Sequence, residues 1–104
     1  MKRMSQFASM LFLGALAISP LQANEELATS SGCMTCHKVD MKVVGPSFKD
    51  VAAKYKGDSG AEAALIEKVK KGGSGAWGAI PMPPNSPRVS DADIKTLVDW
   101  ILGM

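Results

Sequence analysis

Both cysteines and the only histidine of this 104-residue chain lie together in the pentapeptide C-M-T-C-H at residues 33–37. Two cysteines that are separated by two residues and followed at once by histidine form the attachment signal for c-type haem. This spacing lets Cys33 and Cys36 each add a sulfur across a vinyl group on one edge of the porphyrin, and it brings an imidazole nitrogen of His37 to the iron. The pentapeptide therefore predicts a covalently held haem.

Two other chemistries use the same cysteine spacing, namely dithiol oxidoreductases and zinc sites. A structural zinc ion takes four ligands, whereas the whole chain offers two cysteines and one histidine. A dithiol oxidoreductase does not require the adjacent histidine. Both alternatives therefore explain the pentapeptide less well than haem attachment does.

The first 23 residues have the pattern of a secretory signal peptide. Lys2 and Arg3 give a positive start, residues 7–18 form an apolar run, and Pro20 interrupts it. The run is shorter than the ~20 apolar residues that a transmembrane helix needs. We expect cleavage after Ala23 and export to the periplasm.

Cleavage at that point leaves residues 24–104 as a single small domain with a limited apolar core. A buried haem would supply a large flat apolar body on which helices can pack. Without Lys2 and Arg3, the ten remaining basic residues equal the ten acidic ones in number. The charge balance thus gives no indication of nucleic-acid binding.

The rest of the chain predicts helices and loops, with no convincing strand. Ser47 and Ser90 are expected to cap helices, and Ser59 is expected to form a capping box with Glu62. Apolar residues recur at i, i+3 and i+4 in the segments that follow these serines. The expected helices cover residues 24–32, 47–57, 59–72 and 90–102.

One methionine is well placed to act as a second axial ligand. Four methionines follow the predicted signal: Met34, Met41, Met82 and Met104. The four residues from His37 to Met41 extend only ~14 Å, too little to travel around the ring and also pack. Met82 has the required separation, and Pro81 and Pro83 reduce the entropy lost when its loop is fixed. Spacing alone leaves open that Met82 is core filler.

Three motifs in one order resemble those of class I bacterial cytochromes c of the c-551/c-552 type. They are C-M-T-C-H at 33–37, V-V-G-P at 43–46 and W-G-A-I-P-M-P-P-N at 77–85. The resemblance covers residues 24–104. It implies an all-α fold, the small class I cytochrome c fold, in which about four helices wrap around one covalently attached haem c and the terminal helices cross.

The resemblance also implies ligands for the iron. His37 and Met82 are expected to bind the metal from opposite faces, and the Pro46 carbonyl is expected to accept the proton on the other nitrogen of His37. Cys33 and Cys36 are expected to hold the porphyrin.

Three further haem-binding roles carry over from the family. Trp77 is expected to donate toward a haem propionate, with a plain core role as the alternative. Asn85 is expected to hydrogen-bond near the Met82 sulfur, with a turn role as the alternative. Lys68 stands where the family often has an arginine near the propionate, so the charge is kept but the bidentate fork is lost. Residues 86–88 make this loop longer than in the commonest members.

A haem with imidazole and thioether ligands stays low-spin in both oxidation states, so it changes state with little ligand movement. We therefore expect a monomeric electron carrier, not an enzyme, that docks transiently on redox partners. Lys38, Lys42 and Lys49 could steer acidic partners, or they form an ordinary solvated face. The alternatives are a sensor or enzyme with an open sixth site, and a haem-c subunit of a larger complex.

Overall fold

The computed structural model describes the backbone of residues 20–104 and the side chains of residues 24–104. Most of the predicted signal peptide, residues 1–19, lies outside the described residues, so its cleavage stays a prediction. The helices are α1 (Pro20–Ser30), α2 (Phe48–Lys54), α3 (Ala61–Lys71) and α4 (Asp91–Leu102), with a short 3-10 turn at Cys33–Thr35.

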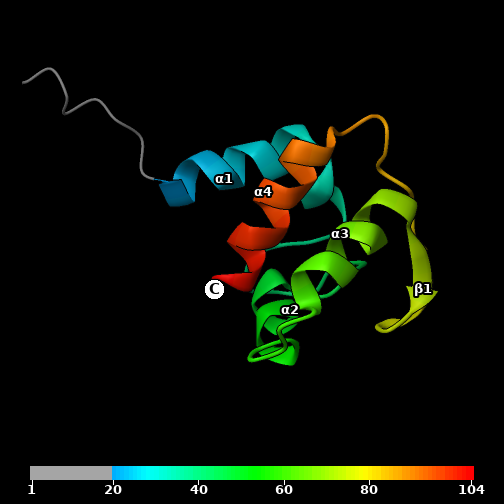
Figure 1. Ribbon diagram of the computed structural model, residues 1–104. Helices are drawn as coiled ribbons and strands as arrows, with labels where there is room; N and C mark the ends of the chain where they lie inside the picture. The colour runs from blue at the N-terminus through cyan, green and yellow to red at the C-terminus, as the bar shows by residue number, and fades with distance from the viewer. Residues whose placement is uncertain (1–19) are drawn as a thin grey trace, which may run out of the picture.

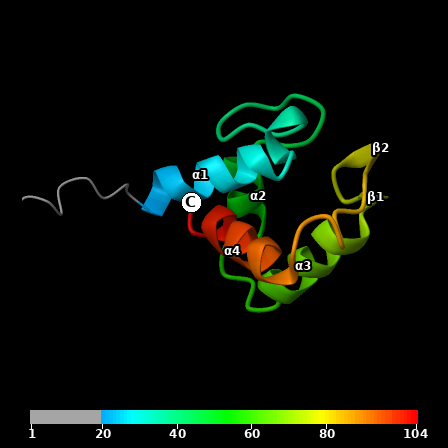
Figure 2. The same ribbon diagram turned by 90° about the horizontal axis from the view of Figure 1, so that it is seen from above.

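Helix α4 packs against the three other α-helices, as Figures 1 and 2 show. Its apolar residues follow the helical repeat, which gives it two buried faces. One face joins a cluster with α1 and α2: Ala28, Phe48, Leu97 and Trp100. The other face packs with α3 and the loop before α4: Val89, Ile94 and Val98, with Leu65 and Val69 partly buried beside them. The predicted contact between the terminal helices α1 and α4 is confirmed.

Two of the three predicted serine caps are present. Ser47 and Ser90 each accept a hydrogen bond from the backbone N–H three residues on, at 3.1 Å in both cases. The predicted capping box of Ser59 is wrong, because α3 begins at Ala61 and has no side-chain cap. The carboxylate of Asp58 instead accepts from the Gly60 N–H at 2.9 Å, which closes a local turn before the helix.

Helix α1 begins four residues before the expected start at residue 24. Pro20 is its first residue, and proline suits this position because its missing N–H would have no partner within the helix. The helix ends at Ser30, after which Gly32 takes a left-handed conformation with φ of 89°. That conformation favours glycine, and it turns the chain sharply into the 3-10 turn.

The sequence predicts no strand, and this prediction is also wrong. Strands β1 (Gly73–Gly75) and β2 (Gly78–Met82) form an antiparallel pair, in which Gly73 faces Met82 and Gly75 faces Gly78. Glycine and proline are poor strand formers, so the segment carries little strand signal. Pro81 is tolerated because a two-stranded sheet has only edge strands. The all-α fold class is unchanged, and the hairpin extends beyond the end of α3 (Figure 2).

Candidate functional site

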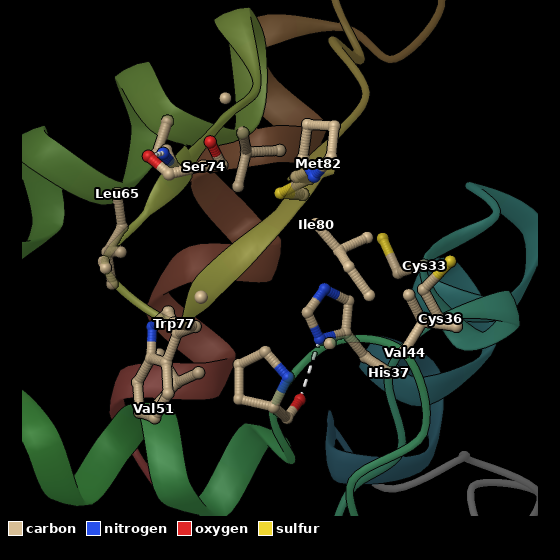
Figure 3. Close-up of a pocket in the computed structure, with 18 of the residues that line it drawn as sticks. Cys33, Cys36, His37, Val44, Val51, Leu65, Ser74, Trp77, Ile80 and Met82 are labelled. Carbon is tan, nitrogen blue, oxygen red and sulfur yellow. Dashed lines mark hydrogen bonds between the residues drawn. The ribbon is translucent and has the colours of Figure 1, made fainter.

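A cavity of about 300 Å³ lies between the 3-10 turn, α2, α3, α4 and the hairpin. This volume is at the lower end of the range for small-molecule and cofactor sites. Figure 3 shows its walls, which come from elements far apart in the sequence. Most of the lining is apolar: it includes Val44, Pro46, Leu65, Val69, Leu97 and Ile101. The cavity therefore suits a largely apolar ligand.

Three large apolar side chains of the lining are exposed in the polypeptide alone. Ile80 is 69% exposed, Val44 46% and Trp77 42%. Leaving apolar surface in water costs roughly 25 cal/mol per Å², and a cluster of such residues marks a surface that something covers. A flat apolar group bound in the cavity would cover all three.

The two predicted attachment cysteines lie beside each other at one end of the cavity (Figure 3). The 3-10 turn brings them together, because the N–H groups of Cys36 and His37 both donate to the Cys33 carbonyl, at 3.3 and 3.0 Å. Both are free thiols. Burial raises the pKa of the Cys33 thiol, and the nearby Arg88 charge opposes this only in part. Dithiol oxidoreductases depend on a lowered thiol pKa, so the raised value does not favour that alternative.

The zinc alternative also lacks a ligand set in the structure. Across residues 20–104, no group of three or more His, Cys, Asp or Glu side chains lies close enough together to hold a metal ion. A structural zinc site needs four such ligands. The described residues therefore give no support to the zinc alternative.

His37 enters the cavity with a fixed orientation. Its Nδ1 donates a hydrogen bond to the Pro46 carbonyl at 2.8 Å. Since a carbonyl only accepts, Nδ1 carries a proton, and in the neutral imidazole Nε2 then has the lone pair that binds metals. The Phe48 ring stacks on the imidazole, with centroids 5.2 Å apart. Gly45 lies against the ring so closely that a Cβ there would overlap it.

Met82 enters the same cavity from the end of β2, while His37 enters from the loop after the 3-10 turn (Figure 3). The Met82 backbone lies against the end of α3, where a Cβ on Gly72 would overlap the Met82 carbonyl. Gly72 also has a φ of 74°, which favours glycine. The site thus brings a thioether and an imidazole to one cavity from chain segments 45 positions apart.

Lys68 and Trp77 also line the cavity, on the side of the hairpin. Lys68 Nζ donates to the Ser74 carbonyl at 3.4 Å, so it holds β1 to α3. The Trp77 ring lies 5.4 Å from the Lys54 ammonium, a cation–π contact that the sequence did not indicate. Their predicted roles at a propionate stay predictions, which their places on the cavity wall allow.

Asn85 is buried but does not line the cavity. Its Nδ2 donates to the carbonyls of Val69 and Pro83, at 3.0 and 3.2 Å. Both N–H groups of the amide are therefore used, so a hydrogen bond near the Met82 sulfur would require one of them to be released. That role stays a prediction.

This arrangement defines a class of protein: a small helical shell around an apolar cavity, with two thiols at one end and an imidazole and a thioether within it. The donor set fits haem c, because the thiols suit covalent attachment and the two other groups suit iron. No helix within residues 20–104 is both long enough and apolar enough to cross a membrane.

Comparison with known proteins gives the same class. The family described as cytochrome c matches residues 22–104. Cytochrome c-551 of Allochromatium vinosum is 53% identical over 91 residues, covering 86% of this chain and 96% of the relative. Cytochrome c-552 of Nitrosomonas europaea is 52% identical over 97 residues, covering 88% of this chain and 93% of the relative.

Solved structures agree. The crystal structure of wild-type Nitrosomonas europaea cytochrome c552 aligns with a TM-score of 0.72 and 54% identity, covering 76% of this chain and 96% of that one. The chain belongs to the cytochrome c family, and its similarity to the c-551 and c-552 members confirms the predicted resemblance. The predicted cofactor is confirmed as well: the family carries haem c on a cysteine pair, here Cys33 and Cys36.

Proposed function

We propose that this protein is a periplasmic electron carrier that holds a single haem c with His37 and Met82 as the axial ligands. The hydrogen bond from His37 Nδ1 to the Pro46 carbonyl supports this most directly, because it leaves Nε2 free on a ring that the cavity already orients. Met82 supplies a sulfur to the same cavity from the hairpin.

Each residue of the site then has a distinct task. Cys33 and Cys36 fix one edge of the porphyrin, and the hydrogen-bonded His37 keeps a constant direction toward the metal. Met82 would supply the second protein ligand to the iron, which would exclude small molecules from it. When bound, the haem supplies an iron that exchanges one electron between its ferrous and ferric states.

The apolar cavity wall would favour the reduced state of the haem iron. Thioether ligation raises the reduction potential of haem iron, and an apolar lining disfavours the additional charge of the ferric form. The apolar lining of this site therefore supports a carrier that accepts electrons readily.

Electron exchange requires short-lived docking on redox partners, and the surface near the cysteines supports this. Lys38, Lys42 and Lys49 are exposed, and Met41 and Val43 between them are 59% and 45% exposed. This segment exposes apolar side chains together with three lysines, although Asp40 and Asp50 are exposed beside them, and such a mixed surface suits weak association with a partner. Monomeric behaviour is part of the proposal, as is the export that the first residues indicate.

The spectrum of the purified holoprotein tests the proposal. We expect a low-spin spectrum in both oxidation states, the weak ferric iron–methionine band, and no carbon monoxide binding near neutral pH. A high-spin spectrum with immediate carbon monoxide binding would instead indicate an open sixth site and a sensor or enzyme.

A further inference from the structure

Arg88 connects two segments that are far apart in the sequence. Its guanidinium donates to the Ser31 carbonyl at 2.9 Å and to Oδ1 of Asn85 at 2.7 Å. Ser31 and Asn85 are each only 7% exposed. The arginine lies on the surface, in the loop drawn in orange in Figure 1, and satisfies two buried oxygens. Hydrogen bonds from a charged donor are the stronger kind.

Arg88 stabilises one orientation of the Asn85 amide. A guanidinium has only donors, so the amide oxygen must face it. The amide nitrogen then faces the other way, where it donates to the carbonyls of Val69 on α3 and Pro83. Without the arginine, the buried oxygen would lose its partner, and only the two carbonyl contacts of the amide nitrogen would hold the side chain.

The amide orientation matters for Met82. Pro83 directly follows Met82, and the backbone there already lies in close contact with Gly72 at the end of α3. By holding the Pro83 carbonyl, Asn85 keeps the end of β2 against α3. The other partner of Arg88, Ser31, lies two positions before Cys33. A continuous set of hydrogen bonds therefore joins the cysteine segment to the methionine segment.

We propose that Arg88 is a positioning residue for the sixth ligand: by orienting Asn85, it keeps the Met82 sulfur at the iron. This inference rests on the proposed function, because it needs Met82 as an axial ligand. It predicts that loss of Arg88 loosens the methionine while leaving the covalent haem and the His37 side in place.

Imidazole, which competes with the methionine for ferric iron, measures that loosening. We expect Arg88→Met to bind imidazole about tenfold more tightly than the wild-type holoprotein, the effect of losing roughly one charge-assisted hydrogen bond. Arg88→Lys keeps the charge but places its donors on one nitrogen and loses the fork that reaches both oxygens, so we expect about threefold tighter imidazole binding. Lys95→Met is the matched control: it removes a surface charge bound to Glu62 and Asp99, and should leave the imidazole affinity unchanged.

A double-mutant cycle separates positioning from general destabilisation. If Arg88 acts through Asn85, adding Arg88→Met to Asn85→Ala should change the imidazole affinity by less than about twofold. A tenfold change in both backgrounds would overturn the inference. So would a wild-type imidazole affinity in Arg88→Met. If Arg88→Met yields no folded holoprotein, Arg88→Lys is measured instead, and a wild-type imidazole affinity in that variant would overturn the inference.

The wild-type spectrum distinguishes this failure from that of the proposed function. If the ferric iron–methionine band is absent from the wild type, Met82 is not the ligand, and both proposals fall. If the band is present and the Arg88 variants bind imidazole as the wild type does, only the role of Arg88 is overturned.

Discussion

The imidazole of His37 donates to the carbonyl of Pro46, nine positions away, across 2.8 Å. The loop between them is closed by the N–H groups of Val44 and Gly45, which both donate to the Cys36 carbonyl at 3.2 and 2.8 Å. The turn that places Cys36 at the cavity therefore also places the acceptor for the histidine ring. The position of the attachment cysteine and the orientation of the His37 ring therefore depend on the same loop.

Gly45→Ala should disturb this loop selectively. A Cβ at Gly45 would overlap the His37 ring, so the ring or the backbone must move, and overpacking of this kind costs about 1–3 kcal/mol. We expect guanidinium unfolding of the holoprotein to show that loss. Gly60→Ala is the control: its nearest contact would be an ordinary 3.5 Å, and we expect only the loss of about 0.5 kcal/mol that alanine causes in place of glycine at a helix N-cap. Equal stability of the two variants would contradict the close packing.

The serine caps give a test of where the helices begin. Ser47→Ala and Ser90→Ala each remove a hydrogen bond to the first turn of a helix. Each should lower the free energy of unfolding by about 1 kcal/mol. Ser59→Ala should stay within about 0.5 kcal/mol of the wild type, because α3 has no side-chain cap. A loss at Ser59 as large as at Ser90 would mean that the capping box forms after all.

Cys33→Ala or Cys36→Ala should leave mostly unfolded apoprotein when the haem is not retained. The apolar wall of the cavity, including Ile80 at 69% exposure, is then left in water, and so small a domain has little other core. Far-UV circular dichroism with thermal melting measures this, and wild-type protein produced without haem maturation should give the same result. A cooperatively folded, haem-free domain would show that the porphyrin is not part of the core.

Much of this fold is predictable from the sequence because the determining interactions are local. Ser47 and Ser90 lie three positions from the N–H groups that they cap. The apolar stripe of α4 follows the helical repeat, and Ile94 and Val98 on it are fully buried. The five residues from Cys33 to His37 lie in one short turn, so their spacing alone indicates their chemistry.

The missed features depend on contacts between distant residues. Nothing near Arg88 in the sequence indicates that it binds the Ser31 carbonyl, 57 positions away. The β hairpin carries little strand signal because glycine and proline dominate it, and its conformation depends on glycines with positive φ, such as Gly75 and Gly78. The predicted Ser59 cap is wrong because α3 begins at Ala61, which places Gly60 at the cap position, and Asp58 closes the turn before it.

Replacing Met82 tests the central claim most directly. Met82→Ala leaves Cys33, Cys36 and His37 unchanged, so covalent haem and most helical structure should be retained while the sixth position opens. We expect the ferric iron–methionine band to vanish, the reduction potential to fall, and carbon monoxide or cyanide to bind. A variant with the wild-type spectrum and potential would show that Met82 does not bind the iron.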